Sequence, residues 1–200
     1  MEIRILGPLE ASENGQPLVV DPPGVVTRID AATSSVVGKW HFPSASGVAV
    51  GDGAAWVLTG DGVARIPATR VSQPLMISLG STAGGPSAAA QAIAFGAGAV
   101  WTTNALSDPS CMHAPCPQRP GNVFRIDPHT NIVAATIGAG FNRPVGAAFG
   151  DGSLWVVADS SLFRVDPAQN RVVARISLGQ QPVGVAAGSG RIWVAVGAAN

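Results

Sequence analysis

The densest group of reactive side chains in this sequence lies in one short segment. Cys111, His113 and Cys116 place two thiols and an imidazole within six residues, and Asp108 lies just before them. Such side chains could ligate zinc, but structural zinc sites usually draw their ligands from two separated pairs. The alternatives are a local disulfide between Cys111 and Cys116 and a pair of unlinked thiols. The spacing therefore predicts no metal or other cofactor, and it leaves the state of the two cysteines open.

The rest of the chain shows no catalytic constellation. The three histidines, His41, His113 and His129, fall at unrelated positions of the repeat described below, and no Ser lies in a G-x-S-x-G elbow. The chain also lacks the glycine patterns that bind phosphates or dinucleotides. The sequence favours a non-catalytic function over an enzymatic one.

Tryptophan and arginine mark an internal repeat. The pattern G-x-G-x-φ-W (φ, apolar) occurs four times, as GDGAAWV at 51–57, GAGAVWT at 96–102, GDGSLWV at 150–156 and GSGRIWV at 188–194. Each copy is preceded by an Arg-containing string, namely TRIDAAT at 27–33, ARIPATR at 64–70, FRIDPHT at 124–130 and FRVDPAQ at 163–169. Four copies in one register indicate a repeat protein.

The repeated tryptophans have two interpretations. They could surround a ligand, but a position that recurs in every unit favours packing between units. We therefore expect a structural role for Trp56, Trp101, Trp155 and Trp193. The repeated arginines are expected to pair with the aspartates two residues later, or to lie on the surface, where such pairs contribute little.

Each unit is predicted to contain four strands joined by tight turns. In the last complete copy these strands are 144–150, 153–159, 161–166 and 171–179. The Asp-Gly pairs at 52–53 and 151–152 supply the positive φ angles that a two-residue hairpin requires. Four-stranded units repeated about every 38 residues predict an all-β chain made of four β-propeller blades.

Two resemblances accompany these patterns. The string RVDPAQNRVVARISLGQQPVGVAAGSGRIWVA resembles the YVTN-type repeat of lactonase-like β-propellers, over about residues 25–196. It implies a fold and no particular activity, because this architecture serves enzymes, lectins and protein-binding proteins alike. The first 20 residues, MEIRILGPLEASENGQPLVV, resemble the opening strands of the winged-helix domain in SARP-type regulators. The DNA-binding helices of that family do not follow here, so its DNA-binding role does not carry over.

The predicted organisation is a β-hairpin segment with a linker at 1–24, followed by propeller repeats at 25–200. The repeats begin with the third and fourth strands of a unit and end with the first and second, at 25–30, 35–41, 183–188 and 191–196. These halves could share one blade and close a four-bladed ring. We favour the alternative, an open arc of a larger propeller, because the N-terminal junction suggests a truncated ancestor.

One face of the predicted propeller carries the longer loops, including an insertion at 104–121. Function concentrates in loops that a rigid scaffold positions. We therefore predict a non-catalytic binding module with its ligand or protein site on this face. The alternatives are a lactonase-like or lyase-like propeller enzyme and a truncated fragment of a SARP-type regulator. The candidate binding residues are Asp61, Asn104, His113, Arg143, Asp159 and Gln181.

Composition limits the partners. The 12 basic and 12 acidic residues balance and are scattered, which provides no basic stripe for nucleic acid and no polybasic membrane anchor. No apolar run is long enough to span a bilayer, and the first residues lack a signal-peptide pattern. We expect no nucleic-acid or membrane partner, an unknown protein or small-molecule ligand, and self-association through exposed blade edges. The expected location is cytoplasmic, or extracytoplasmic if the chain is a fragment.

Overall fold

The computed structural model describes residues 18–21, 24–60, 62–68, 73–79, 88–106 and 120–197. Every regular element in these ranges is a β-strand, and the strands form five sheets. The all-β prediction is confirmed. Within the described part of the chain, no helix is long and apolar enough to cross a membrane.

Three sheets are complete four-stranded blades, in which neighbouring strands follow one another along the chain. Blade 2 contains β4 (Gly47–Gly51), β5 (Ala54–Leu58), β6 (Gly62–Pro67) and β7 (Leu75–Ser78). Blade 3 contains β8 (Ala88–Gly96), β9 (Ala99–Leu106), β10 (Pro120–Asp127) and β11 (Ile132–Asn142). Blade 4 contains β12 (Pro144–Gly150), β13 (Ser153–Ala158), β14 (Ser161–Asp166) and β15 (Arg171–Ser177).

The two terminal sheets are incomplete. Blade 1 contains β1 (Leu18–Asp21), β2 (Val25–Asp30) and β3 (Ser35–His41), whereas the half-blade contains only β16 (Pro182–Gly188) and β17 (Arg191–Val196). β1 belongs to the predicted N-terminal segment, and it pairs with β2 at the place that a second strand takes in the complete blades. The rest of the predicted N-terminal hairpin lies outside the described residues.

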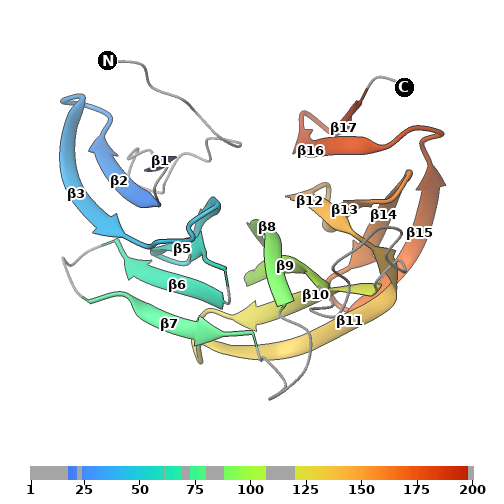
Figure 1. Ribbon diagram of the computed structural model, residues 1–200, viewed down its shortest axis with the longest axis horizontal. Helices are drawn as coiled ribbons and strands as arrows, with labels where there is room; N and C mark the ends of the chain where they lie inside the picture. The colour runs from blue at the N-terminus through green and yellow to red at the C-terminus, as the bar shows by residue number, and fades with distance from the viewer. Residues whose placement is uncertain are drawn as a thin grey trace, which may run out of the picture.

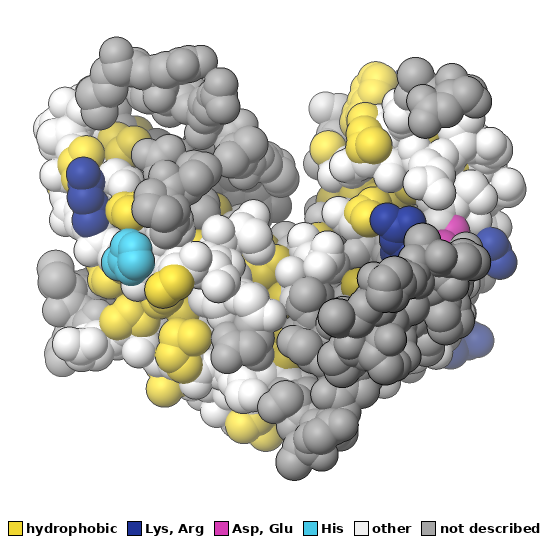
Figure 2. All heavy atoms as spheres, viewed as in Figure 1, with side chains coloured by type: hydrophobic (Ala, Val, Ile, Leu, Met, Phe, Trp, Pro, Cys, Tyr) yellow, Lys and Arg dark blue, Asp and Glu magenta, His cyan; other side chains and the backbone are white. Residues whose placement is uncertain are grey.

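The sheets form an open arc, with blade 1 and the half-blade on opposite arms (Figure 1). In the space-filling view a notch separates the two arms (Figure 2). Among the described strands β17 pairs with β16 alone, while β2 pairs with β1 and β3. The alternative of a four-bladed ring with a shared blade is therefore wrong, and the favoured open arc has three complete blades between two partial ones. Closure fails because the arms stand apart and β1 occupies the edge of β2 that β17 would need.

The hairpins between first and second strands have the predicted geometry. Asp52 and Gly53 have φ angles of 53° and 64°, and Asp151 and Gly152 have 52° and 69°. Both central residues of each turn are thus left-handed, as a type I′ turn requires. Its twist matches that of the flanking strands, so each Asp-Gly pair fixes the register of its hairpin.

The hydrophobic core lies between blades. One cluster joins blades 2 and 3 and includes Trp56 and Ile126, which are both fully buried. The next cluster joins blades 3 and 4, where the rings of Phe141 and Phe163 meet edge to face with their centroids 5.0 Å apart. Because each inner blade is covered on both faces, a second strand such as β5 is buried along its whole length.

Candidate functional site

The repeated tryptophans and arginines lie opposite each other on neighbouring strands. In blade 2 the register pairs Trp56 with Arg65, and the equivalent residues pair in blades 3 and 4. The three guanidinium carbons lie 5.4, 5.8 and 5.7 Å from the indole centroids, which is a cation–π arrangement. Each indole Nε1 also donates a 3.0 Å hydrogen bond to a glycine carbonyl in the preceding strand. The stacking of arginine on tryptophan was not predicted, although the nine-residue separation of Trp and Arg in blades 2 and 4 signals it.

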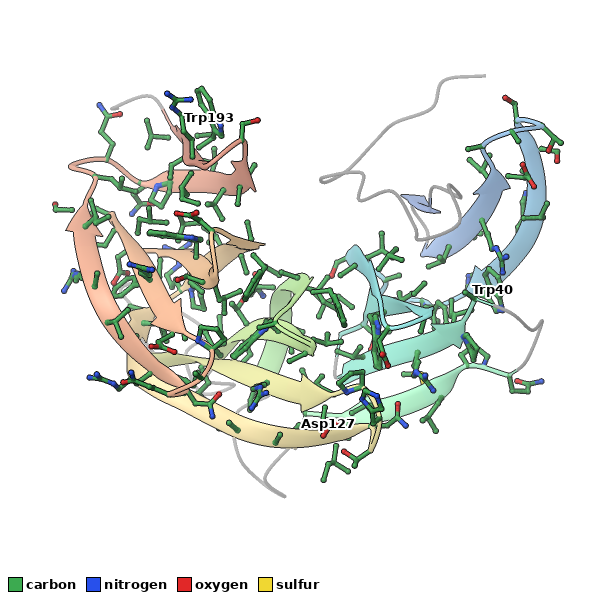
Figure 3. The ribbon with its side chains drawn as sticks, turned by 180° about the vertical axis from the view of Figure 1, so that it is seen from behind. Trp40, Asp127 and Trp193 are labelled. Carbon is green, nitrogen blue, oxygen red and sulfur yellow. The ribbon has the colours of Figure 1, made fainter. Side chains whose placement is uncertain are left out.

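In blades 1, 3 and 4 an aspartate lies two residues after the repeated arginine and shapes the turn between the third and fourth strands. Oδ1 of Asp127 accepts hydrogen bonds from the backbone N–H groups of His129 and Thr130, at 2.8 and 3.2 Å. Asp30 and Asp166 each accept the same two bonds in their own turns. The two backbone hydrogen bonds hold the pKa of Asp127 below its usual value, and the charge of nearby His129 adds to their effect. Figure 3 labels Asp127 at the tip of its hairpin.

Burial of the tryptophans decreases toward the C-terminal end of the arc. Trp56 and Trp101 are 0% exposed, Trp155 is half-buried and Trp193 is 64% exposed. Trp56 and Trp101 belong to the clusters that join their own blade to the next one. No described blade follows the half-blade, so Trp193 departs from the structural role that we expected for all four. Figure 3 shows it at the end of one arm.

The predicted loop-face residues divide into three groups. Asp61, Cys111, His113 and Cys116 lie outside the described residues. Asn104 needs a correction, because it lies in β9 with 1% of its surface exposed, and its Oδ1 accepts a 2.7 Å hydrogen bond from the backbone N–H of Asn122. It therefore holds β10 in place and is not available to a ligand. The ends of the predicted insertion at 104–121 also need a correction, because residues 104–106 belong to β9 and residues 120–121 belong to β10.

Arg143, Asp159 and Gln181 lie in connections between strands. Arg143 and Asp159 both have left-handed backbones, with φ of 49° and 50°, and Asp159 N–H donates to the carbonyl of Asn142 at 3.1 Å. This bond brings the β13–β14 turn, which holds Asp159, beside the connection from blade 3 to blade 4, which holds Arg143. Gln181 is exposed in the connection to the half-blade, and its carbonyl accepts from the N–H of Gly197. The described residues contain no cluster of His, Cys, Asp and Glu that could hold a metal ion.

A groove of about 250 Å³ lies along the inner side of the arc. Its wall comes from four successive sheets, and each contributes three consecutive residues at or just before its first strand: 46–48, 91–93, 145–147 and 183–185. None of these twelve residues is titratable, and Val145 and Val183 are 40% and 65% exposed. This groove was not predicted from the sequence, because the predicted binding site lies in the loops. The small residues that recur four positions before each strand-ending glycine (Gly47, Ala92, Gly146, Gly184) are the signal in the repeat.

Comparison with solved structures identifies the arrangement of blades. A chain of the mitotic checkpoint complex matches with a TM-score of 0.67 and 10% identity, over 88% of this chain and 52% of its own length. The Dos1 propeller matches with a TM-score of 0.64 and 11% identity, over 88% and 48%. This chain has a β-propeller fold. The propeller also matches the dihydro-heme d1 dehydrogenase NirN, with a TM-score of 0.66 and 16% identity, over 88% of this chain and 38% of the dehydrogenase.

These likenesses concern the fold alone, since every identity is far below the level that indicates shared function. The chain spans about half or less of the length of the three structures. No protein-family model matches the sequence, and no curated protein matches it. Propellers that resemble this one include both parts of protein assemblies and enzymes.

Proposed function

We propose that this propeller is a non-catalytic binding module that receives a protein partner in its inner groove. The lining of the groove is the observation that carries this proposal. Small and aliphatic side chains from four consecutive sheets gather in one concavity, and Val145 and Val183 remain exposed there. Exposed apolar surface in a hollow is typical of interaction sites. Because none of the lining side chains can exchange protons, the groove itself offers no acid–base catalyst.

The chemistry of the groove favours an apolar segment of a protein as its ligand. The exposed valines would contact aliphatic or aromatic side chains of the partner. Arg143, Asp159 and Gln181, in the connections of the neighbouring loop face, would supply a polar rim. The match to a chain of the mitotic checkpoint complex supports protein recognition, since that propeller belongs to a protein assembly.

A photo-crosslinking experiment tests the proposal. A benzophenone side chain at position 183 would lie in the groove, and the matched control at position 132 would lie on the outer strand β11, where Ile132 is 59% exposed. We expect position 183 alone to capture a partner in extracts of the source cells. Val183→Arg should then weaken binding of that purified partner at least tenfold, and Ile132→Arg should not. Equal capture from both positions, or binding indifferent to Val183→Arg, would contradict a groove site.

The proposal also covers the repeat type, the origin of the N-terminal segment, the cellular location and self-association. We propose that the repeats at 25–200 form a YVTN-type propeller domain, that residues 1–20 derive from a SARP-type regulator, and that the protein is cytoplasmic. We also propose that its exposed blade edges self-associate. The alternative, a lactonase-like or lyase-like enzyme, draws support from the likeness to a dehydrogenase. Turnover of a lactone substrate that persists in Val183→Arg would favour it.

A further inference from the structure

We infer that the half-blade is completed by β2 and β3 of a second copy of this chain, so that two chains close one ring. This inference rests on the proposed self-association and names the partner and the contact. The half-blade supplies a first and a second strand, and blade 1 supplies a third and a fourth. Each chain thus carries both halves of one blade, on opposite arms of the arc (Figure 1).

The glycines of β16 indicate what kind of surface should cover the half-blade. In the inner blades, glycines of the first strand are covered by the blade that follows: a Cβ on Gly51 would collide with the ring of Phe95, and one on Gly96 with that of Phe149. A Cβ on the equivalent Gly188, or on Gly184, would meet none of the described residues within 4 Å. The surface that packs against the next blade is therefore present on β16 but empty.

The matching surface is present at the other end of the chain. β4 is the first strand of blade 2, and its Val48 and Val50 stand at the repeat positions of Ile93 and Phe95 in β8. They are half-buried, and the cluster that they join is shared by blades 1 and 2. If β2 and β3 of one copy join the half-blade of another, β4 of the first copy comes to lie beside β16 of the second. Val48 and Val50 then cover Gly184 and Gly188, as Ile93 and Phe95 lie against Gly47 and Gly51.

The pairing of tryptophan with arginine in the complete blades also indicates β2 of a second copy as the neighbour of β17. In the complete blades the second-strand tryptophan faces the third-strand arginine, as Trp56 faces Arg65. Trp193 is the tryptophan of the half-blade, and Arg28 is the arginine of β2. Within one chain, Arg28 pairs in register with Leu18 of β1. Exchange of β1 for β17 of the other copy would place Arg28 over Trp193 and remove a large exposed indole from water.

The number of strands is consistent with a closed ring. Strands β2 to β17 amount to four blades, so two chains supply eight. Propellers typically contain four to eight blades. Head-to-tail contact that closes after two copies also hides every blade edge, whereas contact that did not close would give filaments.

Cysteine crosslinking tests the contact directly. In the inner blades Val57 pairs with Ala64, which places Val194 of β17 opposite Thr27 of β2. A chain with Val194→Cys and Thr27→Cys, and with Cys111 and Cys116 changed to serine, should form a covalent dimer under mild oxidation. A control chain with Val194→Cys and Ile132→Cys should not. An internal crosslink would indicate a ring of one chain and overturn the inference, as would the absence of any crosslink. In a chain with Val19→Cys and Thr27→Cys, a crosslink between these two residues, which pair in β1 and β2, would show that β1 is not displaced.

Sedimentation of the full chain provides the second measurement. We expect wild-type protein to sediment with the mass of two chains. Trp193→Glu should weaken dimerisation by at least roughly 30-fold. Ile132→Glu should not change it, because Ile132 is similarly exposed but lies away from both ends of the arc. Deletion of residues 1–21 should strengthen dimerisation, because it frees the edge of β2. A wild-type chain that stays monomeric, or Trp193→Glu without effect, would overturn the inference. The groove partner should still bind the monomeric Trp193→Glu variant. Failure of the dimer can therefore be distinguished from failure of the proposed function.

Discussion

Trp101 and Trp193 occupy the same position of the same repeat and have opposite environments. Trp101 is 0% exposed between blades 3 and 4, with a guanidinium over its ring and its Nε1 bonded to the carbonyl of Gly96. Trp193 is 64% exposed on a sheet that has only two strands. The sequence around the two residues is similar, so the difference arises from what lies next to them. In this fold the repeat specifies one half of an interface, and the following blade supplies the other half.

Such a fold distributes its stability over the contacts between neighbouring units. Blades 2 and 3 share one core cluster and blades 3 and 4 share another, whereas no described blade covers the outer face of the half-blade. Substitutions in the interior of the arc should therefore lower the stability most, and those at its C-terminal end should lower it least.

The largest difference is expected for the tryptophans themselves. Trp101→Ala should destabilise the chain by about 3–5 kcal/mol, as truncation of a buried aromatic typically does. Trp193→Ala should cost less than about 0.5 kcal/mol in the monomer, because its side chain is largely solvated there. Trp155→Ala should lie between them. Urea unfolding at low protein concentration measures all three, and equal losses for Trp101→Ala and Trp193→Ala would refute the comparison.

The glycines that end the first strands give a second contrast. Gly96→Ala should cost about 1–3 kcal/mol, because the added methyl group collides with the ring of Phe149 in the next blade. Gly188→Ala should be neutral or stabilise by up to about 1 kcal/mol, since a methyl group there meets none of the described residues within 4 Å. Thermal unfolding of the two variants is sufficient. Destabilisation of the monomer by Gly188→Ala would show that its surroundings are already filled.

Much of this fold could be predicted from the sequence, because the repeat is local. The strands at 25–30, 35–41 and 191–196 were predicted at the residues where β2, β3 and β17 lie. The contacts between units could not be predicted in the same way, since they depend on how blades are placed in space. That is why the groove along the first strands was missed, because four sheets build it. The burial of Asn104 and the stacking of arginine on tryptophan are contacts within one blade, and they were missed because the pairing of the second strand with the third was not worked out residue by residue. The open arc and an N-terminal β segment were both predicted, and the structure adds the register in which β1 pairs with β2.

A smaller effect concerns the arginines over the tryptophans. Nε of Arg164 donates to Oγ of Ser153 at 2.8 Å, whereas the buried Nε of Arg125 has no hydrogen-bond partner among the described residues. Ala99 stands in blade 3 where Ser153 stands in blade 4. Ala99→Ser should therefore stabilise the chain by about 1 kcal/mol, and Ser153→Ala should destabilise it by a similar amount. Urea unfolding of both variants tests this expectation, and a loss of stability in Ala99→Ser would mean that the tight packing around Ala99 outweighs the new hydrogen bond.

The smallest effects should occur at the rim turns, where interior and end become equivalent. Asp30, Asp127 and Asp166 each accept two backbone N–H bonds within their own turn. Substitution by alanine should therefore destabilise blades 1, 3 and 4 by similar small amounts, unlike the tryptophan series. An Asp127→Ala effect much larger than that of Asp30→Ala would show that the rim also depends on neighbouring blades.

The pH dependence of Asp127 identifies the source of its contribution. The backbone hydrogen bonds from His129 and Thr130 lower its pKa in the folded chain, so the folded state binds a proton less readily than the unfolded state. Its stabilisation should be fully present above the unfolded pKa of about 3.9 and should be lost as the pH falls through the lower folded value. The difference in unfolding free energy between wild type and Asp127→Ala should thus be present above the unfolded pKa and should shrink in stronger acid. The difference should persist in a His129→Ala background, because the backbone N–H groups are the larger cause. A difference that vanished with His129→Ala would assign the effect to the imidazole.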